Sequence, residues 1–289
     1  MSPVPRLDSV QCLSPAGLHR MAYAEWGDPR NPRVLVCVHG LTRLGRDFDR
    51  LARAMADVYR VVCPDVVGRG RSDWLREPMH YGVPQYVADM VTLLARLNAT
   101  TVHWVGTSMG GLIGISLAGL QDSPISRLVI NDVGPRLDAA AVARIGSYVG
   151  APVRFGSVDE AIDYVMKVAA PFGLRTREEW REIAEPSLRA DGAGWVLHYD
   201  PRIAEPFKAV TPQSAAAGEA ALWKLYDAIA CPTLLTRGAD SDLLRRDTAE
   251  EMTRRGPRAR LVEFPGVGHA PMFFHDDQIA VVRNFLLEE

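Results

Sequence analysis

The sequence predicts an α/β fold in which a mostly parallel central sheet carries helices on both faces and is interrupted by an inserted helical cap. The segment Val34–Val38 is a continuous apolar run, typical of a strand buried on both faces of a parallel sheet. Strand-like and helix-like segments alternate up to about residue 131, which is the pattern of repeated parallel units. From about residue 136 to 226 only helical patterns occur, and the alternation then returns at Thr233.

Each element follows from its own pattern of apolar residues and breakers. Residues 1–17 contain three prolines and one glycine, and we expect no regular structure there. The helical insertion explains the length of 289 residues better than two tandem domains do, so we expect a core of residues 1–135 and 227–289 and a cap of residues 136–226. The expected core elements are, in order, strand 18–26, strand 34–38, helix 48–55, strand 59–63, helix 84–97, strand 101–105, helix 112–118, strand 128–130, strand 233–236, helix 247–255, strand 260–264 and helix 276–287.

The net charge, the cysteines and the motifs limit which partners and cofactors we expect. The net charge of −2 gives no reason to expect nucleic acid or an anionic membrane as a partner, so we expect a small-molecule substrate. Four cysteines without metal-ligand spacing indicate free thiols in a reducing cytoplasm, and the amino-terminal residues lack a signal-peptide core. We expect no metal and no other cofactor, because neither H-E-x-x-H nor a G-x-G-x-x-G after a strand occurs. A homodimer is compatible with the sequence, which does not determine the oligomeric state.

The stretch around Ser108 predicts a nucleophile. The segment Gly106-Thr107-Ser108-Met109-Gly110 has the form G-x-S-x-G, with an apolar strand before it and a helix after it. In such a turn the serine adopts a strained backbone conformation that exposes its Oγ above the sheet. The flanking glycines leave room for the crossing strand and helix, so we expect Ser108 to be nucleophilic.

A serine hydroxyl needs a neighbouring base, usually histidine. Of the seven histidines, His269 lies in Gly268-His269-Ala270-Pro271, directly after a predicted strand. Loops that follow parallel strands meet at one edge of the sheet, which is where Ser108 is expected. We therefore expect His269 to be the base, with His275 as the reserve.

The base needs a carboxylate that fixes its tautomer. The loop after the strand at Thr233 offers two acids, Asp240 and Asp242, and the residues alone leave both open. The oxyanion of an acyl-transfer intermediate needs two backbone N–H donors, for which we expect those of Met109 and Leu41. We expect His39 to brace this loop rather than to react.

These motifs together resemble the α/β-hydrolase fold family, in its His-Gly type with a helical cap. The resemblance covers roughly residues 18–289 and implies Ser108 as nucleophile, His269 as base and Leu41 and Met109 as oxyanion donors. The family's usual acid position is occupied by Ser241, and relatives with a similar Ser-Asp-Leu-Leu segment favour Asp242 as the acid. Asp240 stays open, and Asp132 stands where some members place the acid. The motifs that carry the resemblance are His39-Gly40, Asp65-x-x-Gly68-x-Gly70-x-Ser72-Asp73, Gly106-x-Ser108-x-Gly110-Gly111, Gly238-x-x-x-Asp242 and Gly268-His269-x-Pro271.

The resemblance implies a serine hydrolase that cleaves a carboxylic ester, lactone or thioester-like acyl bond, hydroxyalkanoate oligomers included, through an acyl-enzyme on Ser108. One alternative is a carbon–carbon bond hydrolase acting on a diketone-type ring-cleavage product. Such enzymes share Ser-Met-Gly-Gly but usually carry Asn where this chain has Thr107. An alternative of another class is a ligand receptor built on the same fold. The candidate pocket residues in the cap are Trp195, His198, Tyr199 and Phe207, and Arg69 and Arg71 are candidates to meet a substrate carboxylate or to brace their loop.

Overall fold

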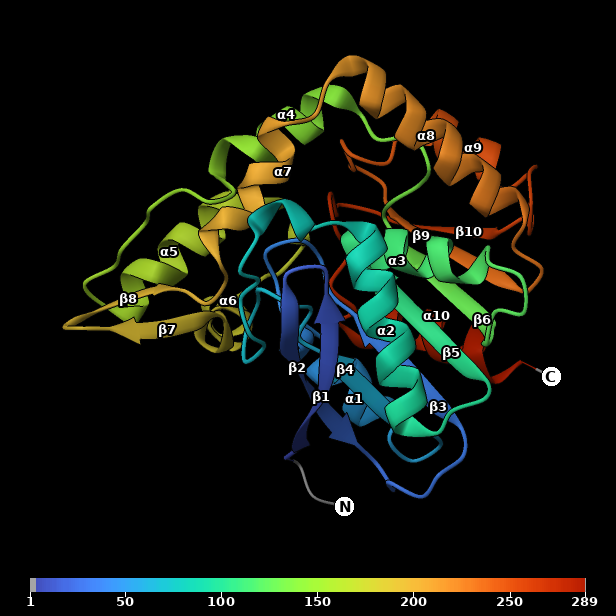
Figure 1. Cartoon of the computed structure of the whole chain (residues 1–289), viewed down its shortest axis with the longest axis horizontal. Helices are drawn as coiled ribbons and strands as arrows, with labels where there is room; N and C mark the ends of the chain where they lie inside the picture. Colours follow the sequence, from blue (N-terminus) through green and yellow to red (C-terminus); the bar gives the residue numbers. More distant parts are fainter. Residues whose placement is uncertain (1–3, 289) are drawn as a thin grey trace.

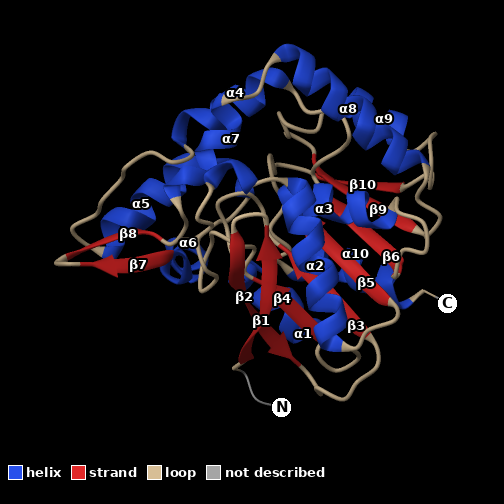
Figure 2. Ribbon diagram, viewed as in Figure 1, coloured by secondary structure: helices blue, strands red, loops and turns tan. Residues whose placement is uncertain are grey.

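An eight-stranded sheet forms the centre of the molecule, in a computed structural model that describes residues 4–288 (Figures 1 and 2). Its strand order is β1-β2-β4-β3-β5-β6-β9-β10. The pairs from β4 to β10 in this order are parallel, whereas β1 and β2 pair antiparallel with each other and β2 pairs antiparallel with β4. The mostly parallel sheet is therefore confirmed. The strands are β1 (Arg6–Ser14), β2 (Gly17–Trp26), β3 (Val34–Val38), β4 (Arg60–Pro64), β5 (Val102–Thr107), β6 (Ile125–Asn131), β9 (Thr233–Gly238) and β10 (Arg260–Phe264).

Helices cover both faces of this sheet (Figure 2). Strand β3 shows the arrangement, because Val34, Val36 and Val38 point into one apolar cluster and Leu35 and Cys37 into the other. The first cluster is completed by α2 (Val83–Leu97), α3 (Met109–Ala118), α8 (Pro212–Asp227) and α9 (Arg246–Met252). The second is completed by α1 (Asp49–Met55) and α10 (Asp276–Leu287). Burial on both faces is the reason for the continuous apolar run that revealed the strand.

The amino-terminal prediction is wrong for residues 6–14. These residues form β1, which pairs along its whole length with β2 in a hairpin (Figure 1). As an edge strand it buries Val10 and Cys12 but exposes Leu7 and Leu13, so its sequence does not alternate cleanly between apolar and polar residues. Residues 1–3, which the same prediction covered, lie outside the described residues.

The segment between β6 and β9 carries α4 (Ala139–Tyr148), α5 (Val158–Val168), α6 (Arg177–Ala184) and α7 (Glu205–Lys208), followed by α8. It also contains the hairpin of β7 (Leu188–Asp191) and β8 (Gly194–Leu197), so the expectation of helices only is wrong here. A two-residue turn of Gly192 and Ala193, in which Gly192 has φ +57°, closes this hairpin. Helix α8 packs on α3, with the backbone of Leu225 against Gly119, so the end of the segment contributes to the core. The division into core and cap at residues 136 and 226 stays a prediction.

Candidate active site

Ser108 occupies a sharp turn between β5 and α3. Its backbone angles are φ 51° and ψ −114°, a left-handed conformation that side-chain-bearing residues rarely adopt. A Cβ on Gly106 would lie 2.1 Å from the carbonyl oxygen of Gly110, and one on Gly110 would lie 2.0 Å from that of Val38. Only glycine leaves the space that this turn needs, which is the physical content of the G-x-S-x-G motif.

His269 reaches Ser108 from the loop after β10. Its Nε2 lies 3.0 Å from Ser108 Oγ, within hydrogen-bond distance for proton transfer. The imidazole side chain is 10% exposed, so it is shielded from bulk water but open to the cavity. The sequence placed both residues at the carboxyl edge of the sheet, and the structure brings them together there.

Asp132 is the carboxylate that contacts His269. It follows β6 directly, and its Oδ2 accepts a hydrogen bond of 2.8 Å from His269 Nδ1. Its side chain is fully buried. The main chain turns sharply here (φ 56°), and the Asp132 N–H donates to the Thr236 carbonyl at 2.8 Å, which locks the residue to neighbouring β9.

The expectation that Asp242 or Asp240 orients the histidine is wrong in this structure. The half-exposed carboxylate of Asp242 instead binds the guanidinium of Arg144 on α4, at 2.8 Å and 3.0 Å. Asp240 is exposed. Both residues lie in the loop after β9, and the carboxylate hydrogen-bonded to His269 is that of Asp132 instead.

Two groups, one at the end of β9 and one in the loop after it, hold Asp132. The Gly238 N–H donates to Asp132 Oδ1 at 2.9 Å, and the Ser241 hydroxyl donates to Oδ2 at 2.7 Å. Ser241 stands at the sequence position where the family pattern has its acid, and its side chain points to the place that the acid would fill. The β9 loop thus still supports the histidine, but through the carboxylate of β6.

The expected oxyanion donors Leu41 and Met109 both line the cavity beside Ser108. A Cβ on Gly40 would lie 3.7 Å from the Ser108 Cβ, so the loop after β3 passes close to Ser108. Met109 is the first residue of α3, whose N-terminus favours negative charge. The use of these two N–H groups as oxyanion donors stays a prediction.

His39 and Arg69 brace the loops around the site. His39 Nδ1–H donates to the Gly40 carbonyl at 2.7 Å, and its Nε2 accepts from the Val66 N–H at 2.9 Å. Desolvation lowers the pKa of His39 to about 3, so the ring is neutral and serves these two bonds. The fully buried Arg69 donates to the carbonyls of Leu41 and Val67 and does not line the cavity.

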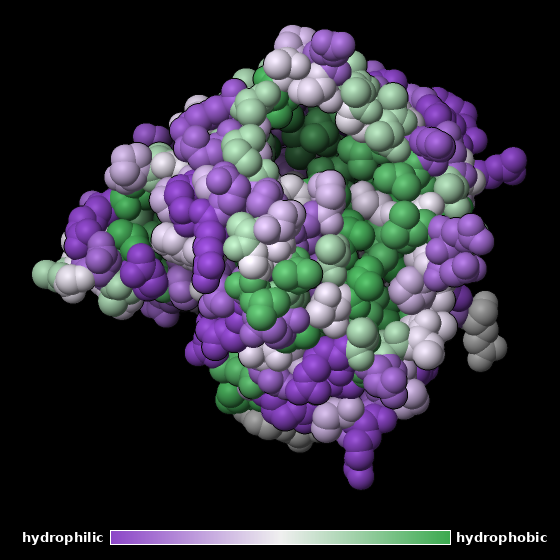
Figure 3. Space-filling model, viewed as in Figure 1, coloured by the Kyte–Doolittle hydropathy of each residue, from purple (hydrophilic) through white to green (hydrophobic). Residues whose placement is uncertain are grey.

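A cavity of about 280 Å³ opens above Ser108 and His269. Helix α4 and residues 197–207 of the inserted segment help to wall it, and Figure 3 shows an apolar hollow beneath the arch that α4, α7 and α8 form in Figure 1. Most of its lining is apolar or aromatic, as in many small-molecule sites.

Of the predicted pocket residues, Tyr199 and Phe207 line this cavity, whereas Trp195 and His198 do not. Trp195 is in β8 and pairs with Phe155, within the packing of the inserted segment itself. His198 lines a separate depression with the exposed Arg71. Alternation explains why His198 and Tyr199 differ, because neighbouring residues of an extended segment point to opposite sides.

Sequence reasoning missed two cavity-lining arginines, Arg43 and Arg144. Arg43 follows the His39-Gly40 motif closely, and that neighbourhood is a signal that could have found it. Arg144 is in a helix of the inserted segment with nothing in its sequence to distinguish it from other surface arginines.

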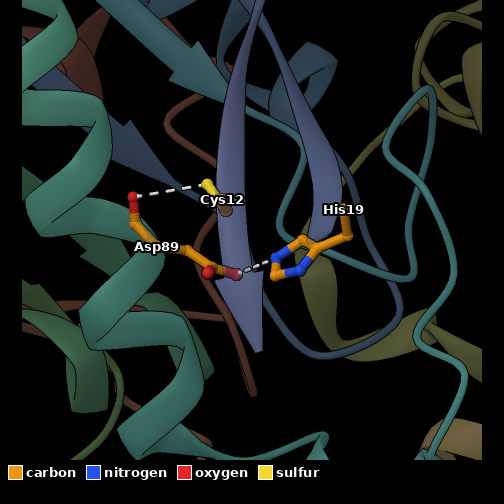
Figure 4. Close-up of side chains that lie close together, drawn as sticks. All are labelled: Cys12, His19 and Asp89. Atoms are coloured by element: carbon orange, nitrogen blue, oxygen red, sulfur yellow. Dashed lines mark hydrogen bonds and ion pairs between the residues drawn. The ribbon is translucent and has the colours of Figure 1, made fainter. Parts of the chain in front are cut away.

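Cys12, His19 and Asp89 form the one group of the described residues that brings three potential metal-ligand atoms within 4.8 Å (Figure 4). The three come from β1, β2 and α2, and His19 Nε2 lies 3.0 Å from Asp89 Oδ2. Burial raises the pKa of the Cys12 thiol to about 12, which favours its protonated form. This group lies apart from the cavity and ties the hairpin of β1 and β2 to α2.

In the described part of the chain, every helix is too short or too polar to cross a bilayer.

Comparison with known proteins gives a consistent result. Residues 35–283 match the model of the "Alpha/beta hydrolase family". A 3-hydroxybutyrate-oligomer hydrolase of Cupriavidus necator is 59% identical over 289 residues, with 99% of each chain covered. A solved hydrolase from Rickettsia typhi has a TM-score of 0.89 at 29% identity, over 98% of this chain and 99% of that one. An alpha/beta hydrolase from Novosphingobium aromaticivorans has a TM-score of 0.84 at 34% identity, over 97% and 98%.

Proposed function

We propose that this chain, which belongs to the alpha/beta hydrolase family and is a carboxylic-ester hydrolase, cleaves the ester bonds of 3-hydroxybutyrate oligomers through an acyl-enzyme on Ser108. The substrate proposal is supported by the 59% identity, along the full length, to a protein named as a 3-hydroxybutyrate-oligomer hydrolase. The mechanism rests on one observation: the hydrogen-bonded chain Ser108–His269–Asp132 opens into an apolar cavity.

The chemistry proceeds in two halves. Ser108 Oγ attacks the ester carbonyl carbon while His269 Nε2 takes its proton, and Asp132 stabilises the imidazolium that forms. The backbone N–H groups of Leu41 and Met109 hold the oxyanion. The tetrahedral intermediate collapses as His269 returns the proton to the departing alkoxide, which leaves as the hydroxyl of a 3-hydroxybutyrate unit.

Water completes the cycle. His269 removes a proton from the water that attacks the acyl-enzyme, and then returns it to Ser108. Each cycle consumes one water and gives one carboxylic acid and one alcohol. The apolar lining suits the methyl-branched acyl unit, which has no charge away from its terminal carboxylate.

The finer points of partner and location are also proposals. Four free cysteines support a reducing, cytoplasmic location, and the net charge of −2 supports a small-molecule substrate without nucleic acid or membrane as partner. A homodimer is a hypothesis that light scattering after gel filtration tests. The core-and-cap division is supported by the α4, Tyr199 and Phe207 contributions to the cavity.

The testing experiment follows monomer release from the 3-hydroxybutyrate dimer and trimer by mass spectrometry. It also compares intact mass after exposure to a fluorophosphonate. Wild type should release monomer and gain one adduct, and Ser108→Ala should lose both. Ser126→Ala is the matched control, because Ser126 is an exposed serine near the start of β6. Monomer release that survives in Ser108→Ala would disprove the proposed mechanism.

A further inference from the structure

The cavity carries few charges. Among its described lining residues, the only arginines are Arg43 and Arg144, and the only carboxylate is that of Asp47. A 3-hydroxybutyrate oligomer carries one permanent charge, its terminal carboxylate. An anion that enters a largely apolar site needs a cationic partner to replace its water, so these two arginines are the candidates.

The Arg43 guanidinium already uses its Nε and Nη2 groups to bind a carboxylate of the protein itself, that of Asp47. Its Nε donates to Asp47 at 2.8 Å, and its Nη2 donates to Asp47 at 2.5 Å and to the Ile183 carbonyl at 2.7 Å. The Arg43 and Asp47 side chains are only 12% and 9% exposed. Withdrawing Arg43 from this pair would leave a buried carboxylate without its counter-charge, which is costly.

Arg144 is differently placed. It forms a two-pronged pair with Asp242 in which the side chains are 39% and 47% exposed, and water can replace either partner. Such exposed pairs add little to stability, so exchange of one carboxylate for another is cheap. The guanidinium presents the planar fork that matches a carboxylate.

The position of the pair fits such an exchange. Arg144 and Tyr148, one turn later on α4, both line the cavity, and so does Leu243, which follows Asp242. The Arg144–Asp242 pair therefore sits at the rim, where the inserted segment meets the β9 loop. Ser108 and Arg144 line the same cavity, so one extended substrate that contacts both would have its ester at Ser108 and its charged end at this rim.

We propose that Arg144 is the specificity residue that binds the terminal carboxylate of the oligomer, which takes the place of the Asp242 carboxylate. This inference rests on the proposed function and deepens it. It makes the enzyme selective for free-acid oligomers over their neutral esters. The β9-loop acid predicted to serve the histidine instead holds the arginine until substrate arrives.

The experiment compares the 3-hydroxybutyrate trimer as free acid and as methyl ester, in wild type, Arg144→Gln and Asp242→Asn. Both variants break the same ion pair, but only Arg144→Gln removes the cation. We expect Arg144→Gln to lower kcat/KM for the acid by about 10- to 100-fold, chiefly through KM, as is typical of a lost charge-assisted bond. Its kcat/KM for the methyl ester should change little. Asp242→Asn should keep or raise kcat/KM for the acid, because it removes the competing carboxylate.

Three outcomes would overturn the inference. Equal losses on both substrates in both variants would mean that the pair only fastens the inserted segment to the core. An unchanged acid-to-ester ratio in Arg144→Gln would mean that the carboxylate binds elsewhere, and the proposed function would stand. The wild-type protein could also cleave neither trimer while Ser108 still gains its fluorophosphonate adduct. That result would disprove both the proposed substrate and this inference.

A further variant, Arg144→Lys, keeps the charge without the planar fork and should recover part of the preference for the acid.

Discussion

Ser241 donates a 2.7 Å hydrogen bond to Asp132, on the same carboxylate oxygen that receives His269 Nδ1. Ser241 follows β9 and Asp132 follows β6, and these two strands are neighbours in the sheet. The acid and its supporting hydroxyl therefore occupy adjacent strand ends. In this chain the carboxylate that contacts His269 comes from the end of β6.

The first prediction concerns the identity of the acid. Asp132→Asn should lower kcat by about 10³- to 10⁴-fold, because an amide cannot hold His269 in the reactive tautomer or stabilise its charged form. Asp242→Asn is the matched control, since its carboxylate binds Arg144 and not His269. Steady-state hydrolysis of a neutral short-chain aryl ester measures kcat for both variants. Equal losses in the two variants would return Asp242 to consideration as the acid.

The second prediction moves the acid between strands. Ser241→Asp in an Asp132→Asn background should recover at least about tenfold of the lost kcat, because a carboxylate at position 241 points to the same place beside His269. Ser241→Ala in that background should recover nothing. If the two double variants have the same kcat, the loop after β9 cannot present an acid to His269.

A third prediction follows from the burial of His39. Burial lowers its folded pKa to about 3 from an ordinary value of about 6.5, so between these values only the unfolded chain binds the proton. Its contribution to stability is complete above pH 6.5 and declines as the pH falls toward 3. At pH 5 the loss is about 2 kcal/mol.

Urea unfolding of wild type and His39→Asn at pH 7 and pH 5 measures this effect. The variant should be less stable at pH 7, where it lacks the ring's bonds, but should lose less stability on going to pH 5. Burial raises the pKa values of Asp47 and Asp65, which changes stability in the opposite direction, but both proteins share those groups. Parallel pH dependences in the two proteins would show that His39 does not contribute as described.

The fourth prediction separates the two cavity arginines by stability. Arg43→Met should lower the free energy of unfolding by about 3–5 kcal/mol, because it leaves Asp47 buried without its counter-charge. Arg144→Gln should cost about 0–1 kcal/mol, since its pair is half-exposed. Urea unfolding at pH 7 measures the free energy of unfolding of both variants. Adding Asp47→Asn to Arg43→Met should restore part of the lost stability. Similar losses for Arg43→Met and Arg144→Gln would contradict this ranking of the two pairs.

Local sequence patterns predicted the central strands of the sheet and the turn at Ser108. The apolar run at Val34–Val38 predicted a central strand because both its faces are buried, and Gly106 and Gly110 predicted the turn at Ser108 because a side chain there would collide with the backbone. His269 was predictable because loops after parallel strands meet at one edge. Strand β1 was not predictable from its sequence. It is an edge strand, and exposed apolar residues such as Leu13 interrupt the alternation of apolar and polar residues.

Tertiary structure alone decided the rest. Asp132, Asp240 and Asp242 are all acids in loops after strands, and only the direction of each side chain selects Asp132. That direction depends on the pairing of β6 with β9 and on the left-handed backbone at Asp132, which no short segment encodes. The cavity likewise depends on where α4 lies over the sheet edge, so Arg144 became visible only in three dimensions. Local sequence patterns thus predicted the central strands and the motifs of the site, and long-range packing decided the edge strand and which side chains meet.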